Sequence, residues 1–333
     1  MFASSTNPKD RPAGELVVPP GATAAKAIRH ILSVDVEDYF QVEAFANVVS
    51  RESWDYWPCR VVESTRVALD LFDRHQAKAT FFFLGWVAQR FPELVREVHS
   101  RGHELACHSF WHRPVYTLTP QEFREDTRRA REVIQQAAGV RVLGYRAPTW
   151  SITNSCLWAL DILAEEGFAY DSSIYPIRHD LYGVPGACRF PYTLTCGNGK
   201  GLREFPPSTV RVAGVTLPVA GGGYLRILPF RFNEWAFRHI ETKYGQPVVV
   251  YFHPWEFDPD QPRIPAKPRS RFRHYTNLRE TQDRVRRLLE LYMFQPFRAL
   301  LPPEANRRAT VEVGRGDYGE LVEGRRWESG HGG

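Results

Sequence analysis

Residues 30–38 read HILSVDVED, a mostly apolar run that ends abruptly in acidic residues. A strand with one face in water would alternate apolar and polar residues, whereas this run predicts a strand buried on both faces. Such strands are typical of parallel sheets that helices cover on both sides. The stretch therefore indicates an α/β fold, and its acidic end is expected at the carboxyl edge of the sheet, where sites form.

Further short apolar runs have the same form, and most of them also end in polar residues. They are ATFFFLG, HELACH, VLGYRAP, FAYDSS, LREFPPS and PVVVYFHP. Helical patterns lie between most of them, and the clearest runs from a capping box at Thr119 and Glu122 to a stop at Gly139. This alternation predicts a distorted (β/α) barrel of about seven parallel strands with helices outside. An open, doubly wound sheet is the alternative.

The composition divides the chain into a barrel and its extensions. Residues 29–257 form the predicted barrel, in which the Pro- and Gly-rich residues 174–230 are an irregular loop and β insertion. Residues 258–301 are a C-terminal extension with one amphipathic helix. We expect a flexible N-terminal tail over 1–28 and a disordered C-terminal tail over 302–333.

Charge and cysteine content exclude several classes of protein. The net charge of +5 over 333 residues comes largely from scattered arginines, which we interpret as solvated helix faces and not as a nucleic-acid site. No apolar run approaches the ~18 residues that span a membrane, and the N-terminus does not resemble a secretory signal. Five cysteines without a Cys-x-x-Cys pair are typical of reduced thiols. These features predict a cytoplasmic protein of undetermined oligomeric state.

Three carboxylates follow the first predicted strand within four positions. On an extended strand Asp35 and Glu37 share a face, whereas Asp38 faces away unless the strand has ended. Like charges this close repel each other unless a cation or an arginine lies between them. The acids therefore indicate a metal site or an ion-paired site.

Two histidines lie four residues apart in the stretch HSFWH. On one face of a helical turn, His108 and His112 can chelate a single metal ion. A carboxylate from another strand end would complete a site with two histidines, one acid and open positions for water. Phe110 occupies the place where iron oxygenases often carry their acid, which argues against oxygen chemistry. Cys107 is interpreted as a small buried residue at a strand end, with a ligand role as the alternative.

Three later strand ends add groups that can move or hold protons. Arg146 can orient a carboxylate, Asp171 adds an acid, and His253 is a candidate general acid. These three side chains can take part in one reaction only if the fold brings them to the end of the barrel where the acids and the histidine pair lie.

With these pieces in order, the chain resembles the NodB-homology polysaccharide deacetylases, the fourth family of carbohydrate esterases. Five short motifs carry the resemblance over roughly residues 30–255, and they are SVDVED, HSFWH, RAP, DSS and YFH. The first motif departs from the family, which usually has two adjacent acids. The form of this motif and the residues after HPWEFDP resemble a subfamily from exopolysaccharide gene clusters associated with exosortase systems.

The resemblance implies a hydrolase that removes N-acetyl groups from a polysaccharide or its precursor with the help of a divalent metal. The metal is expected to be zinc, with cobalt, nickel and iron as alternatives. Its expected ligands are Glu37, His108 and His112, and Asp38 is the alternative to Glu37. Asp35 would be the general base.

The resemblance also assigns roles to the remaining polar groups. Arg146 would orient Asp35, while His253 would protonate the leaving amine with its pKa raised by Asp171. A backbone N–H near Tyr145 or Phe110 would help to stabilise the oxyanion. The residues expected to bind the substrate are Tyr145, Trp111, Trp150, Tyr175 and Trp255. All of these except Tyr145 could stack on sugar, or equally belong to the core.

The expected partner is a glycan, either free or lipid-linked, in exopolysaccharide biosynthesis or modification. One alternative is a related C–N hydrolase that acts on a cyclic amide or imide. A glycosidase with Asp35 and Glu37 as its two carboxyls is another, and an inactive glycan-binding module is the third.

Overall fold

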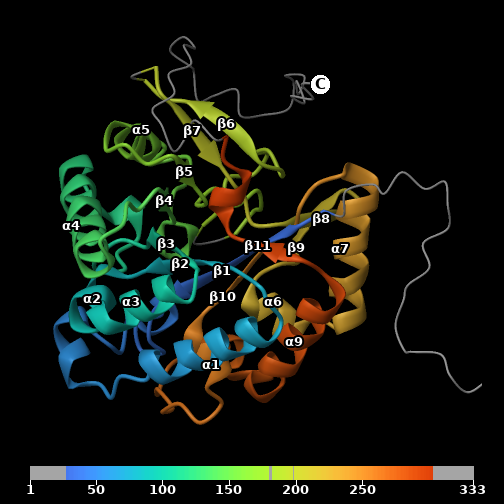
Figure 1. Cartoon of the computed structure of the whole chain (residues 1–333), viewed down its shortest axis with the longest axis horizontal. Helices are drawn as coiled ribbons and strands as arrows, with labels where there is room; N and C mark the ends of the chain where they lie inside the picture. Colours follow the sequence, from blue (N-terminus) through green and yellow to red (C-terminus); the bar gives the residue numbers. More distant parts are fainter. Residues whose placement is uncertain (1–27, 180–181, 198, 303–333) are drawn as a thin grey trace, which may run out of the picture.

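The computed structural model describes residues 28–179, 182–197 and 199–302 (Figure 1). Most of both predicted tails, over 1–28 and 302–333, therefore lies outside the described residues. Strands form one sheet in the order β10-β1-β2-β3-β4-β5-β7-β6, with β11 also paired to β1, and a separate pair, β8-β9. Their bounds are β1 (His30–Val36), β2 (Thr80–Phe83), β3 (Glu104–Cys107), β4 (Gly144–Tyr145), β5 (Tyr170–Asp171), β6 (Tyr192–Thr195), β7 (Gly201–Glu204), β8 (Thr209–Val212), β9 (Val215–Pro218), β10 (Val249–Phe252) and β11 (Phe294–Gln295).

The predicted α/β class and the largely parallel sheet are confirmed. Neighbouring strands from β10 to β7 run parallel, and β6 is antiparallel to β7. The strand path ends at β10 and β6, and no strand pairing joins these two within the described residues. Instead, the Val249 N–H donates to Ser208 Oγ at 2.8 Å, and Gly221 forms a single bridge with Tyr251. The sheet is therefore curled, and the predicted seven-stranded barrel is not confirmed.

Helices cover the outside of the curled sheet, with α4 and α7 on opposite sides of it (Figure 1). Helix α4 has the predicted boundaries. Thr119 and Glu122 form a capping box at its start, and Gly139, with a φ of 70°, ends it. The bounds are α1 (Val61–Arg74), α2 (Gly85–Arg90), α3 (Pro92–Ser100), α4 (Pro120–Ala138), α5 (Trp158–Glu165), α6 (Gly222–Ile227), α7 (Phe230–Tyr244), α8 (Pro268–Tyr275) and α9 (Thr281–Leu291). In the part of the chain that the structure describes, no helix is long and apolar enough to cross a membrane.

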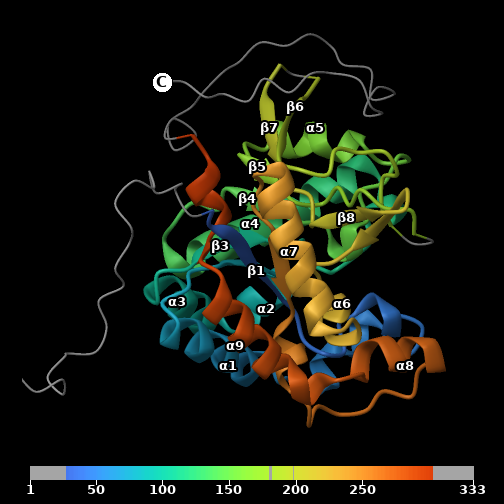
Figure 2. The same ribbon diagram turned by 90° about the vertical axis from the view of Figure 1, so that its right-hand side faces the viewer.

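Strand β1 joins the beginning of the described chain to its end. It pairs with β10 along one edge and with β11 and then β2 along the other, in registers that include His30 with Phe294. Figure 2 shows the last segment of the described chain, coloured red, beside β1 in dark blue. Beyond β11, the buried Phe297 packs its ring against Phe82 and Tyr170, with ring centroids 5.7 and 5.3 Å apart. The predicted C-terminal extension is thus built into the sheet, and its last residues fill space beneath the site.

Candidate metal centre and proton-transfer site

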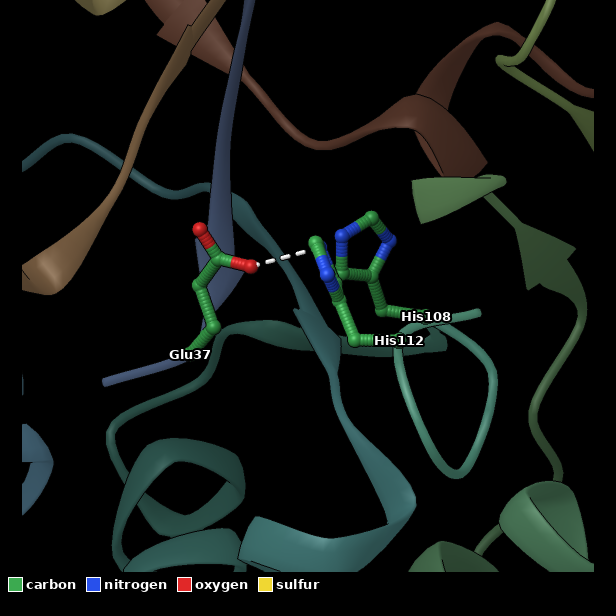
Figure 3. Close-up of side chains that lie close together, drawn as sticks. All are labelled: Glu37, His108 and His112. Atoms are coloured by element: carbon green, nitrogen blue, oxygen red, sulfur yellow. Dashed lines mark ion pairs between the residues drawn. The ribbon is translucent and has the colours of Figure 1, made fainter. Parts of the chain in front are cut away.

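One group of potential metal ligands lies at the carboxyl edge of the sheet. Glu37 directly follows β1, and His108 and His112 follow β3, so the parallel order of the strands brings the three side chains together (Figure 3). One ligand atom from each lies within 4.8 Å of the others, and all three residues are buried. Glu37 Oε2 is 2.7 Å from His112 Nε2.

The neighbouring acid, Asp38, faces a different part of the molecule. Its Oδ2 accepts hydrogen bonds from the backbone N–H groups of Arg60 and Val61, at 2.7 and 3.0 Å. Val61 begins α1, so the carboxylate satisfies amides that the helix itself cannot pair. The structure therefore places Glu37, and not the alternative Asp38, in the group with the histidines.

The two histidines do not lie on a helical turn, which corrects the expectation from their spacing. They belong to a loop in which Ser109 and His112 adopt left-handed φ values of 62° and 51°. The loop is held on one side by Asp126 of α4, which accepts from the N–H groups of Phe110 (2.7 Å) and Trp111 (3.2 Å). The Phe110 N–H is therefore already paired and does not serve as the expected oxyanion donor.

Arg51 holds the same loop from the other side. Its Nε donates to the Trp111 carbonyl at 2.7 Å and its Nη2 donates to the His112 carbonyl at 2.9 Å. Neither Arg51 nor Asp126 was identified from the sequence, because each lies far along the chain from the histidines and in no short motif.

The protonation states of His108 and Glu37 suit metal ligation. Burial lowers the pKa of His108 to about 4, so its imidazole is neutral. Its Nδ1–H donates to the Arg146 carbonyl at 2.8 Å, which leaves the lone pair of Nε2 free for a metal. Burial opposes ionisation of Glu37, but the adjacent His112, His253 and His108 outweigh it and lower the Glu37 pKa to about 2.

Asp35 is held by the buried guanidinium of Arg146. Arg146 Nη1 donates to Asp35 Oδ1 at 2.6 Å and to Ser33 Oγ at 3.0 Å, while Nη2 donates to Ser172 Oγ at 3.0 Å. The guanidinium carbon also lies 4.1 Å from the centre of the Phe82 ring. Oδ2 of Asp35 has no hydrogen-bond partner among the described residues, and it lies 3.9 Å from His253 Nε2.

His253 follows β10 and faces both acids of the first motif. Its Nε2 lies 3.7 Å from Glu37 Oε1, and its Nδ1–H donates to Glu256 Oε1 at 2.8 Å. Burial alone would lower the pKa of His253, but Glu256, Glu37 and Asp35 raise it to about 9. The imidazole is therefore protonated at neutral pH.

Asp171 is not the carboxylate beside His253, which corrects the expectation from the fourth motif. It lies between β4 and β7, where its Oδ1 accepts from Ser173 Oγ at 2.6 Å and it interacts with the buried Glu204. No contact joins it to His253 within the described chain. The spacing His253-Pro254-Trp255-Glu256, a histidine followed three positions later by an acid, is the sequence signal that would have identified Glu256.

Most of the predicted substrate-binding residues are buried. Tyr145 and Tyr175 are fully covered, Trp150 is nearly so, and only Trp111 of the five is partly exposed. Both faces of the Trp255 indole are occupied, by His253 with ring centroids 5.0 Å apart and by His274 at 4.0 Å. Because its N–H donates to Glu37 Oε1 at 3.2 Å, Trp255 supports the site instead of offering a face to sugar.

Comparison with known proteins adds two family matches. Residues 53–167 match the family described as polysaccharide deacetylase, and residues 172–302 match a domain of unknown function, DUF3473. A crystal structure of a Mycobacterium smegmatis protein assigned to the polysaccharide deacetylases covers 92% of this chain and 99% of that chain, with a TM-score of 0.55 and 20% identity. This likeness supports the fold.

Curated relatives match a shorter part of the chain. A peptidoglycan-N-acetylglucosamine deacetylase of Bacillus cereus is 31% identical over 101 residues, which is 30% of this chain and 37% of that protein. A peptidoglycan deacetylase of Helicobacter pylori is 28% identical over 106 residues, or 32% of this chain and 35% of that protein. The chain thus spans little more than a third of the length of these relatives. Together with the family match, they show that this part of the chain is similar to polysaccharide deacetylases.

Proposed function

We propose that this protein is a metal-dependent N-deacetylase that hydrolyses acetamide groups on a glycan. The observation that carries the proposal is the meeting, at one edge of the sheet, of a buried Glu37–His108–His112 group with Asp35 and a protonated His253. The names of the curated relatives, deacetylases of peptidoglycan, agree with this reaction class.

The three grouped side chains fit a divalent cation. Two imidazoles and one carboxylate form a donor set that zinc accepts, and their ligand atoms converge, with Glu37 Oε2 2.7 Å from His112 Nε2. When bound, such a cation polarises the acetamide carbonyl and lowers the pKa of water toward ~7. Zinc is the proposed metal, and cobalt, nickel and iron are alternatives.

The protein supplies the two proton transfers. A water molecule attacks the acetyl carbonyl carbon, and Asp35 Oδ2, which has no other partner in the described residues, accepts its proton. Arg146 fixes the other carboxylate oxygen and so aims Oδ2. As the C–N bond breaks, the Nε2–H of His253 protonates the leaving nitrogen, and the products are acetate and a free amine.

The same geometry argues against a two-carboxyl glycosidase. A glycosidase needs one carboxyl group to be protonated so that it can donate to the leaving oxygen. Here Arg146 contacts Asp35, and the histidines lower the pKa of Glu37 to about 2, so Glu37 is not a proton donor at neutral pH. The contacts therefore support amide hydrolysis.

The proposed substrate is an N-acetylated exopolysaccharide or its precursor, with a lipid-linked intermediate as one form. A cavity of about 490 Å³ supports a neutral glycan, because hydroxyl, amide, imidazole and aromatic groups line it, and two ring contacts connect its wall to Arg146. Its lining residues are Tyr116, Thr153, Asn154, Ser155, His179, Tyr182 and Gly183. Tyr182 lies 6.3 Å from Trp150, whose ring is 5.8 Å from the Arg146 guanidinium carbon. The cytoplasmic location stays a prediction, which cell fractionation tests.

The direct test is acetate release from N-acetylglucosamine oligomers. The expected result is release that a chelator abolishes and that added zinc or cobalt restores. The Asp35→Asn variant is the control, and its rate should fall by ~10²–10⁴-fold with the metal still bound. Release that is insensitive to metal removal, or full activity of the variant, would contradict the proposal.

A further inference from the structure

We infer that the C-terminal part of the chain is a working part of the active site, because Arg226 and Glu256 form a buried chain that positions His253. The inference rests on the proposed function in one respect, the role of His253 as proton donor. It gives a role to the region that matches a domain of unknown function, residues 172–302.

The first link is the pair of hydrogen bonds between Glu256 and His253. Glu256 Oε1 accepts from the Nδ1–H of His253 at 2.8 Å and from its backbone N–H at 3.0 Å. The carboxylate is fully buried, so water does not compete for these bonds. Because Nδ1 holds its proton toward Glu256, Nε2 is the nitrogen that faces Asp35 and Glu37.

The second link fixes the other oxygen of the same carboxylate. Arg226 of α6 donates from Nε to Glu256 Oε2 at 2.8 Å, and only 2% of its side chain is exposed. An arginine makes five hydrogen bonds from a rigid plane, so it constrains the direction of the carboxylate as well as its charge.

The third link ties Arg226 to α8. Its Nη1 donates to the His274 carbonyl at 3.1 Å, and its Nη2 donates to the Arg273 carbonyl at 3.1 Å. The last carbonyls of a helix have no partner within the helix, so they are free to accept from a guanidinium. The chain of contacts therefore runs from α8 through Arg226 and Glu256 to His253.

The residues around Glu256 and His253 leave room for the carboxylate and hold the imidazole ring in place. A Cβ atom on Gly222 would lie 1.9 Å from Glu256 Oε1, so a side chain at this position would displace the acid. Trp255 stacks on His253 from one face, with an interplanar angle of 17°. The ring is thus held by a hydrogen bond in its plane and by an indole on its face.

The kinetic test separates positioning from a merely structural role. In the full-length protein, Glu256→Gln keeps the volume of the side chain and should lower kcat by ~10²-fold, with KM changed by less than about twofold. Arg226→Lys should lower kcat by ~10-fold, because lysine cannot hold both the carboxylate and the α8 carbonyls. The control is Glu166→Gln, which breaks a comparable set of arginine pairs at Arg124 and Arg128 away from the site and should leave kcat unchanged.

A second readout does not depend on any substrate. In protein with isotope-labelled histidine, the Nδ1–H of His253 should give an exchange-protected proton signal, assigned by its loss in His253→Gln. Glu256→Ala should abolish this signal, whereas Glu166→Gln should retain it. A signal that persists in Glu256→Ala, or a Glu256→Gln variant with wild-type kcat, would overturn the inference. Wild-type protein that shows the signal but releases no acetate would refute the proposed reaction and leave the positioning chain intact.

Discussion

Removing the carboxylate of Asp126 should weaken metal binding, although this residue is not a proposed ligand. Asp126 accepts the N–H groups of Phe110 and Trp111, which lie between the two histidines. The loop needs this support, because Ser109 and His112 hold a left-handed backbone that costs about 1–2 kcal/mol for each residue. In Asp126→Ala the backbone can relax, and His112 then leaves its position beside Glu37.

The size of the effect follows from the two lost bonds. Hydrogen bonds to a charged acceptor contribute about 1.5–3 kcal/mol each, so the upper limit is roughly 3–6 kcal/mol. Trp111 is partly exposed, so water will replace part of this energy in the variant. We therefore expect a loss of about 1.4–3 kcal/mol in metal binding, which corresponds to a 10–100-fold weaker affinity.

The assay is a competition titration of metal-free protein with zinc and a chromophoric chelator. The matched control is Glu125→Ala on the same helix, since Glu125 is exposed and contacts Gln121 instead of the histidine loop. Circular dichroism should show both variants folded. If folded Asp126→Ala binds zinc within twofold of the wild type, the loop does not depend on this carboxylate and the reasoning fails.

Three further predictions concern proton binding, the base and the packing around Glu256. Burial lowers the pKa values of His30 and His103 to about 4, and each accepts a backbone N–H at Nδ1, so these two side chains bind fewer protons in the folded than in the unfolded state between pH 6.5 and 4. Each should therefore contribute a fall in the free energy of unfolding of about 1.4 kcal/mol per pH unit near the middle of this window, and urea midpoints of His30→Gln and His103→Gln with the wild-type pH dependence would contradict this. Arg146→Lys should lower kcat on N-acetylglucosamine oligomers by ~10²-fold through misdirection of the base, and undiminished turnover would exclude that role. Gly222→Ala should lower the free energy of unfolding by about 1–3 kcal/mol in urea titrations, because its Cβ would clash with Glu256. An unchanged midpoint would show that the Glu256 side chain can move aside without cost.

The sequence predicted best what depends on strand periodicity. Asp35 and Glu37 were expected on one face of the first strand, and the structure directs both toward His253. The carboxyl ends of parallel strands meet at one edge of a sheet, so the sequence alone predicted that the acids, the histidine pair and His253 lie close together.

Contacts that depend on tertiary packing could not be predicted in this way. The spacing of His108 and His112 suited a helix, but the bonds from Asp126 and Arg51 stabilise a loop with left-handed residues instead. The motif containing Asp171 suggested a partner for His253, whereas the chain places Glu256 there, three residues after the histidine. Trp255 was expected to stack on sugar because it is aromatic, but in the structure two imidazoles cover its ring.

The position of β1 between β2 and β10 has a consequence for synthesis on the ribosome. Strands β1, β2 and β3 bring Glu37 and the two histidines together within the first part of the chain. By contrast, the partner of β1 on its other side lies some 217 residues later, as the bond from Ser33 to the Val250 carbonyl shows. At ~5–20 residues per second, that interval is on the order of ten to forty seconds. During it the nascent chain exposes one edge of β1 as a site for chaperones, and the metal ligands are complete before the proton donor has been translated.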